Sequence, residues 1–233
     1  MTQAIVSAPA SLYPARPYVL HREGGFRYFN ASDVPGGEIV RLLSGSFARE
    51  PMAAVLGVTA PELAGLIERF MPECRTNGLS VVAVPEGEPE TLAAAFLARD
   101  FKSRLPEGVL QDFPWFLPVG EALMSVGAAY ETRHPRLEPG DAADLWMVGT
   151  DRRFAGRGVA ARLFCICAEL ARDNGFNRCV TECTGRYSQA AAERAGFSEI
   201  ARLPYGEFRF EGRPVFAGVP APHTHLAIYD RPL

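Results

Sequence analysis

The chain has 233 residues, and its 24 lysines and arginines stand against 27 aspartates and glutamates, giving a net charge of −3 at pH 7. Such slight acidity provides no general attraction to nucleic acid or anionic membranes, and no apolar run approaches the roughly 18 residues of a membrane span. With 48% hydrophobic and 22% charged residues, the composition is that of a folded globular protein. We therefore expect a cytoplasmic protein, monomeric or homodimeric, without a signal peptide and without nucleic-acid or membrane partners.

The first half of the sequence predicts a mixture of helices and strands. Residues 1–17 are rich in proline and small residues and predict a flexible lead-in, and we expect residues 18–233 to form one domain. Asp33 is predicted to cap the first helix. In chain order, the predicted elements are a hairpin at 18–29, helices at 33–51 and 59–70, strands at 79–84 and 91–98, a loop at 100–118 and a helix at 119–130.

The second half alternates strands and helices more regularly. Its predicted elements are a strand at 142–150, an amphipathic helix at 156–172, a strand at 176–182, a short helix at 188–195, and strands at 199–203, 205–216 and 225–229. Such alternation implies a central sheet with helices on its faces, so we expect an α/β fold.

The loop between the strand at 142–150 and the helix at 156–172 has the residues of an anion site. Gly156 and Gly158 would let the backbone approach a ligand closely, and the amides at a helix start have no partner within the helix. Arg152, Arg153, Arg157 and Arg162 add positive charge, which suggests a ligand with several phosphates. The pattern is neither a Walker loop nor Gly-x-Gly-x-x-Gly. A glycine-containing loop with a solvated arginine face is the alternative.

Arg153-x-x-Gly156-x-Gly158 resembles the acetyl-coenzyme A signature of the Gcn5-related N-acetyltransferases, and the strand before it and the helix after it match that family. Shorter segments are similar to its insect arylalkylamine (dopamine) N-acetyltransferase branch. They are Glu50-Pro51-Met52, Thr184-Gly185-Arg186-Tyr187-Ser188 with the later Gly196-Phe197, Gly212-Arg213-Pro214-Val215-Phe216, and Pro222-His223-Thr224.

The resemblance implies a mixed, mostly antiparallel twisted sheet flanked by helices, with a coenzyme-binding core at about 142–203. It implies acetyl-coenzyme A as cosubstrate, no metal, and direct acetyl transfer to a primary amine of a small molecule, an arylalkylamine being one candidate. It places an oxyanion-stabilising amide near Val148, Gly149 and Thr150. The further coenzyme contacts that it implies are Arg153, Phe154, Ala155, Gly156, Arg157, Gly158, Val159, Ala160 and Ser188.

Glu50 is the candidate general base, because an amine attacks a thioester only after it has lost its proton. Its alternative role is that of an acidic residue at a helix end. Thr184 and Ser188 are candidates for protonating or steadying the leaving thiolate, or for capping a helix. The tyrosine that many members of the superfamily use as general acid is replaced by Ala192, which leaves Ser188 or Tyr187 for that role.

Several residues keep two interpretations. His223 and His225 could form a metal pair or serve as structural or substrate-wall residues, and the odd number of cysteines predicts reduced, buried thiols. Phe113, Trp115 and Phe116 could line an amine pocket or anchor their loop to the core. For the whole chain, the alternatives to an enzyme are a catalytically inactive coenzyme A-binding regulatory module and a site for an unrelated nucleotide.

Overall fold

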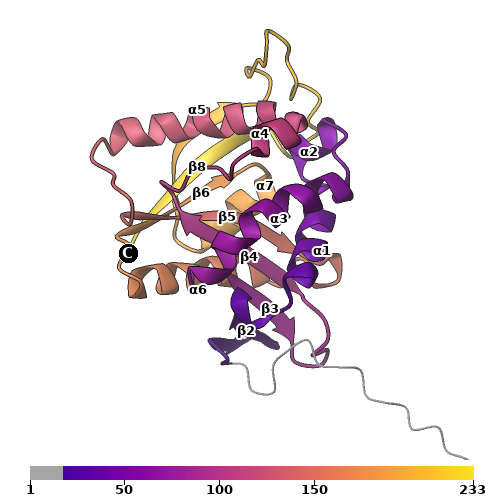
Figure 1. Cartoon of the computed structure of the whole chain (residues 1–233), viewed down its shortest axis with the longest axis vertical. Helices are drawn as coiled ribbons and strands as arrows, with labels where there is room; N and C mark the ends of the chain where they lie inside the picture. Colours follow the sequence, from indigo (N-terminus) through magenta and orange to yellow (C-terminus); the bar gives the residue numbers. More distant parts are fainter. Residues whose placement is uncertain (1–17) are drawn as a thin grey trace, which may run out of the picture.

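The computed structural model describes residues 18–233, so the predicted lead-in at 1–17 lies outside the described residues. An eight-stranded sheet in the order β1-β2-β3-β4-β5-β6-β8-β7 forms the centre of the molecule (Figure 1). All neighbouring strands are antiparallel except β5 and β6, which run parallel. The strands are β1 (His21–Glu23), β2 (Phe26–Asn30), β3 (Val81–Pro85), β4 (Ala94–Asp100), β5 (Ala142–Thr150), β6 (Arg178–Cys183), β7 (Ser198–Pro204) and β8 (His225–Pro232).

Helices cover both faces of this sheet. One face carries α1 (Gly36–Phe47) and α3 (Ala60–Thr76) over β4 and β5, with α5 (Leu117–Arg133) over β7 and β8. The short helices α2 (Pro51–Val55) and α4 (Val109–Asp112) join these elements. On the other face, α6 (Val159–Asp173) packs on β3 to β6 and against α7 (Arg186–Arg194). No helix of the described residues is long and apolar enough to cross a membrane.

The structure corrects three of the predicted elements. The first helix begins at Gly36, because Asp33 belongs to a separate 3-10 turn and Pro35 precedes the helix. Residues 100–118 contain α4 and a 3-10 turn at Pro114–Phe116. Residues 205–216 form turns with a single bridge between Phe210 and Arg213, and Phe216 packs on the rings of Tyr205 and Phe208 instead of extending a strand.

β5 contains one extra residue relative to β4. Leu97 pairs with Met147 and Arg99 pairs with Asp144, so three steps along β5 match two along β4. Such a bulge bends a strand and increases its local twist. β5 pairs with β6 only from Ala142 to Asp144, and beyond that point the two strands separate. The Thr181 hydroxyl, which donates to the Leu145 carbonyl at 2.8 Å, bridges them where the separation begins.

α1 lies directly against the separated part of β5. A Cβ atom on Gly149 would lie 2.8 Å from Leu43 Cδ2 and 3.0 Å from Ser46 Cβ, both on α1. The missing side chain therefore sets how closely this helix approaches the strand. The close backbone approach that the sequence predicts at Gly149 is made by α1.

We expect Gly149→Ala to destabilise the fold by about 1–3 kcal/mol, because an added methyl group in a packed core forces its neighbours to move. Denaturant unfolding measures this free energy, with Gly87→Ala as the matched control, since a Cβ at that position meets no atom within 4 Å. Equal unfolding free energies for the two variants would contradict the tight contact between α1 and β5.

Candidate active site

A cavity of about 260 Å³ lies where β5 and β6 separate. It extends from α1 and α2 on one face of the sheet to Phe164 of α6 on the other. Its walls are mostly apolar with a few polar groups, as is usual for a small-molecule site. The polar and aromatic residues that line it are Ser46, Phe47, Arg49, Glu50, Trp115, Phe116, Trp146, Phe164, Thr181, Glu182, Thr184, Tyr187, Ser188 and His223.

Glu50 is held at the start of α2, and its side chain lines the cavity. Its Oε2 atom accepts hydrogen bonds from the amides of Met52 and Ala53, both at 3.0 Å. Among the described residues, its buried Oε1 atom has no hydrogen-bond partner. Burial raises the pKa of Glu50, against the stabilising effect of the Thr184 side chain and the two amides. The carboxyl group is therefore fixed in orientation and retains one oxygen for a ligand.

Thr184 and Ser188 line the same cavity as Glu50; Thr184 precedes α7 and Ser188 lies in its first turn. The Ser188 hydroxyl donates to the Gly185 carbonyl at 2.9 Å and accepts from the Gly185 amide at 3.4 Å, so it closes the first turn of α7. The Thr184 carbonyl accepts a hydrogen bond from the Tyr205 hydroxyl. The predicted capping function of Ser188 thus coexists with a position on the cavity wall.

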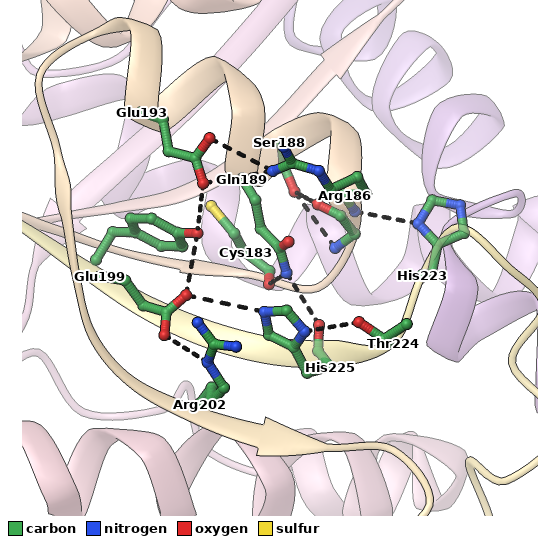
Figure 2. Close-up of polar contacts among 12 residues, drawn as sticks. Cys183, Arg186, Ser188, Gln189, Glu193, Glu199, Arg202, His223, Thr224 and His225 are labelled. Atoms are coloured by element: carbon green, nitrogen blue, oxygen red, sulfur yellow. Dashed lines mark hydrogen bonds and ion pairs between the residues drawn. The ribbon is translucent and has the colours of Figure 1, made fainter.

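The two histidines make separate contacts around α7 (Figure 2). His223 Nδ1 accepts a hydrogen bond from the Arg186 amide at 3.1 Å, and its ring lies beside that of Tyr187 on the cavity wall. His225 interacts with the Thr224 hydroxyl at 2.8 Å and lies 3.8 Å from Glu199. Only His223 lines the cavity, which fits its predicted role as a wall residue.

The predicted aromatic group divides between the two roles suggested for it. Trp115 and Phe116 line the cavity. Phe113 packs on α3 instead, where its ring would lie 3.1 Å from a Cβ on Gly65. The aromatic wall is completed by Phe47 and Trp146, which the sequence alone did not indicate.

The predicted phosphate loop joins β5 to α6. Gly156 and Gly158 have φ angles of +76° and +79°, a left-handed conformation that favours glycine. The first helical bond of this turn runs from the Arg162 amide to the Gly158 carbonyl, so the amides before Arg162 have no partner within the helix. Ala155, Gly156, Arg157 and Gly158 are exposed, Ala160 is half-buried, and Phe154 and Val159 are buried anchors.

The arginines of this loop are largely engaged by the protein. Arg153 forms ion pairs with Asp151 at 3.1 Å and with Glu88 at 3.2 Å. The Arg157 guanidinium lies 4.4 Å from the centre of the Phe26 ring. Arg162 pairs with Glu23 at 2.7 Å. The backbone amides and the exposed Arg152 are therefore the donors that are most directly available to an anion at this loop.

The last three residues of β5, at which the sequence predicts the oxyanion donor, face different parts of the structure. Val148 lines the cavity, Gly149 faces α1, and Thr150 lies in a surface cleft together with Arg49 and Arg152. The bulge lies between Asp144 and Met147, before the predicted position of the oxyanion donor. The part of β5 that follows the bulge no longer pairs with β6, because pairing between these two strands ends at Asp144.

Two carboxyl groups near the cavity, the buried Asp144 and the half-buried Glu182, were not predicted from the sequence. Asp144 of β5 and Glu182 of β6 lie where these strands separate. Burial raises the pKa of Asp144, and the charge of Glu182 raises it further. Burial also raises the pKa of Glu182, to about 7, against the opposing effects of backbone hydrogen bonding and Arg99. A charged residue within an otherwise apolar strand was the signal that could have indicated them.

The raised pKa of Glu182 predicts how its removal changes stability with pH. The folded protein binds more protons than the unfolded chain between about pH 4.5 and pH 7, so ionisation of Glu182 lowers wild-type stability as the pH rises through this range. The glutamine of Glu182→Gln does not ionise, so this variant does not undergo the same decrease in unfolding free energy. Its unfolding free energy should therefore increase relative to the wild type over that interval, measured by urea unfolding at a series of pH values.

The control for this measurement is Glu68→Gln, which changes an exposed glutamate on α3. Its unfolding free energy should follow that of the wild type at every pH. Parallel curves for Glu182→Gln and the wild type would contradict a carboxyl group that is hard to ionise at this position.

No protein-family model matches the sequence. Among solved structures, the chain is similar to arylalkylamine N-acetyltransferase 2 from Aedes aegypti, with a TM-score of 0.72 and 19% identity, covering 89% of this chain and 98% of that chain. It is similar to the C-terminal condensation domain of Ebony in complex with beta-alanyl-dopamine, with a TM-score of 0.71, 15% identity and coverage of 84% and 93%. It is also similar to the polyamine N-acetyltransferase of Drosophila melanogaster, with a TM-score of 0.59 and 24% identity, covering 86% of this chain and 97% of that chain.

These similarities extend over most of each chain and include the mixed sheet with helices on both faces. The fold class predicted from the sequence is confirmed. The chain has the fold of the Gcn5-related N-acetyltransferases.

Proposed function

We propose that this protein transfers an acetyl group from acetyl-coenzyme A to the primary amine of a small molecule. The observation that carries the proposal is the convergence of Glu50, Thr184 and Ser188 on one cavity, which is also lined by β5, the strand that leads into the predicted phosphate loop. These residues come from distant parts of the sequence, and the cavity lies where the sheet opens. The structural neighbours, among them an arylalkylamine and a polyamine N-acetyltransferase, support the same reaction class.

The residues present fit acetyl-coenzyme A, which supplies an acyl thioester when bound. The amides at the start of α6 suit its pyrophosphate, because a helix N-terminus combines free N–H groups with the positive end of the helix dipole. The left-handed glycines Gly156 and Gly158 keep this approach free of side chains. The part of β5 beyond Asp144 has no β6 partner and can pair with the pantetheine amides.

Glu50 is proposed to accept the proton of the attacking amine, directly or through a water molecule. Its Oε1 atom lacks a partner among the described residues, and its Oε2 atom is fixed by two amides. A raised pKa brings the affinity of this carboxyl for protons closer to that of the amine, which favours proton transfer near neutral pH.

Thr184 and Ser188 are proposed to protonate or stabilise the leaving thiolate, since both line the cavity that Glu50 lines. Ala192 is buried, and Tyr187 is largely exposed at the rim. Cys183 lies nearby, but burial raises the pKa of its thiol to about 12, which disfavours a nucleophilic thiolate. An amide of β5 beyond the bulge would stabilise the developing oxyanion.

The acceptor side of the cavity favours an amine with an apolar body. Phe47, Trp115, Phe116 and Trp146 supply most of its aromatic surface. An arylalkylamine fits this wall, as the similarity to the Aedes aegypti enzyme also suggests. An aliphatic amine fits it as well, since aromatic walls bury methylene chains.

Thiol release from acetyl-coenzyme A tests the proposal against tyramine, dopamine, serotonin, spermidine, amino acids and an aminoglycoside. Release that depends on one of these amines is the expected result. Tight coenzyme binding without turnover on any amine would instead identify an inactive coenzyme-binding module.

Glu50→Gln should lower kcat by about a hundred- to ten-thousand-fold, the usual contribution of general base catalysis. The glutamine carbonyl still accepts the two α2 amides, so the helix cap is retained. Steady-state kinetics measures the loss, which should be greatest at low pH, where more of the amine is protonated. Glu62→Gln, at the N-terminal cap of α3, is the control. An unchanged kcat in Glu50→Gln would reduce Glu50 to a helix cap.

Gly158→Asp should abolish coenzyme binding, because it places a carboxylate beside the α6 amides that are proposed to hold phosphate. Gly175→Asp provides the matched control. It introduces the same side chain at a left-handed glycine, with a φ angle of +90°, just beyond the other end of α6. Calorimetric titration with coenzyme A compares the two, and equal affinities would remove the phosphate site from this loop.

A further inference from the structure

The connection between β7 and β8, residues 205–224, is a long surface segment that returns to its own start. The Tyr205 amide donates to the Thr224 carbonyl at 3.1 Å, so the two ends of the segment lie side by side. Most of its residues are exposed, but Tyr205, Phe208 and Phe216 are buried and anchor it. Figure 1 shows the segment at the top of the molecule, near α2 and α5. We call it the strap.

One part of the strap packs on α2, the short helix that begins directly after Glu50. Phe216 of the strap and Met52 of α2 belong to one cluster of buried apolar residues. A Cβ atom on Gly218 would lie 3.3 Å from Val55 Cγ2, so the backbone of the strap also approaches the end of α2 closely. The strap therefore supports the helix that holds the proposed general base.

The start of the strap contacts the other proposed catalytic group. The Tyr205 hydroxyl donates a hydrogen bond to the Thr184 carbonyl. Tyr205 is only 4% exposed. Burial raises the pKa of its hydroxyl, and the charge of Glu50 raises it further. The hydroxyl therefore stays protonated at neutral pH and remains a donor for this carbonyl.

The end of the strap contacts the same turn from another direction. His223 Nδ1 accepts a hydrogen bond from the Arg186 amide at 3.1 Å (Figure 2). Gly185 lies between the strap and α2, because a Cβ atom there would be 3.2 Å from His223 Nδ1 and 3.4 Å from Pro51 Cγ. The turn that joins β6 to α7 is thus enclosed by both ends of the strap and by α2.

The position of Thr184 relative to Glu50 affects the charge of the proposed base. Burial raises the pKa of Glu50, and the Thr184 side chain acts against this rise. Groups that take part in a reaction must be held within about 0.5 Å of their productive positions, usually by hydrogen bonds from residues behind them. Tyr205 occupies such a position behind Thr184, since it holds the backbone of that residue and is not among the residues that line the cavity.

We propose that Tyr205 is a positioning residue for acetyl transfer, which acts through the Thr184 carbonyl and thereby sets the place of the Thr184 hydroxyl in the cavity. The inference rests on the proposed acetyltransferase function and adds a residue to its machinery. The Tyr205 hydroxyl contacts neither coenzyme nor amine in this role, and its effect depends entirely on Thr184.

Tyr205→Phe removes the hydroxyl and keeps the ring, whose centre lies 5.9 Å from that of Phe216. We expect kcat for thiol release to fall by roughly tenfold, the effect of one lost hydrogen bond. The KM for acetyl-coenzyme A should stay close to the wild-type value, because the amides of α6 are not altered. An unchanged kcat would overturn the inference.

Tyr229→Phe is the matched control, because it removes the hydroxyl of another buried tyrosine. This hydroxyl donates to Glu193 at 3.2 Å and to Glu199 at 3.4 Å, and Tyr229 is not among the residues that line the cavity. The control should keep the wild-type kcat, and thermal unfolding shows that both variants are folded. An equal loss of kcat in the two variants would overturn a specific role of Tyr205.

A double-mutant cycle with Thr184→Val distinguishes positioning from a general structural effect. Valine removes the Thr184 hydroxyl but retains the carbonyl that Tyr205 contacts. If Tyr205 acts through Thr184, adding Tyr205→Phe to Thr184→Val should cause no further loss of kcat. A further loss of roughly tenfold would overturn the inference, as would a wild-type kcat in Thr184→Val alone.

Hydrogen–deuterium exchange separates this inference from the proposed function, because it needs no turnover. The amides of residues 184–188 should exchange roughly tenfold faster in Tyr205→Phe than in the wild type or in Tyr229→Phe. Faster exchange together with no thiol release from any amine in the wild type would support the hold of Tyr205 on this turn and overturn acetyl transfer. Unchanged exchange and unchanged kcat in Tyr205→Phe would overturn the positioning role, whereas wild-type thiol release would still support acetyl transfer.

Discussion

The separation of β5 from β6 is the constraint on which the candidate site depends. Continued pairing of β5 with β6 would close the gap between the two strands in which the cavity lies. The extra residue between Asp144 and Met147 bends β5 at the point where its bonds to β6 end. The part of β5 beyond Asp144, which pairs with β4 but not with β6, lines the cavity and leads into the predicted phosphate loop. The same bend therefore leaves a cavity and a backbone edge without a β6 partner, where the proposed coenzyme would bind.

Unsatisfied carboxyl oxygens distinguish this region from the rest of the core. Glu50 Oε1 and Asp144 Oδ1 are both buried and without partners among the described residues. Each belongs to a residue whose backbone or second oxygen is firmly held, Glu50 by the α2 amides and Asp144 by strand pairing. Polar groups kept in this state reduce stability, and sites that bind ligands are where such a cost is usually found.

The sequence predicted the parts of the site that depend on local patterns. The glycine and arginine spacing of 153–158 identified the loop, because a left-handed turn before a helix requires particular residues at particular positions. Glu50, Thr184 and Ser188 were identified by resemblance, and the structure places them on one cavity. The expected contributions of Arg153 and Arg157 could not be judged from sequence, because Glu88 and Phe26, which engage them, lie far away in the chain.

The sequence could not predict features that depend on pairing between distant strands. A bulge is defined only by the register of two strands, so β5 alone gives no sign of its extra residue. Asp144 and Glu182 each look like an isolated charge until the parallel pairing brings them to one face. Residues 205–216 are rich in aromatic residues, which favour strands, but in the fold Phe216 packs on the rings of Tyr205 and Phe208.

The arrangement of these walls also bears on how such a protein can evolve. The proposed coenzyme side is built from β5, its loop and α6, whereas the proposed acceptor side is built from α1, α2, α5 and residues around His223. The two sets meet mainly across the gap between the strands. Substitutions in α5 or in the loops can therefore alter which amine is accepted while the coenzyme loop stays intact. One scaffold can in this way acquire new acceptors without having to rebuild its donor site.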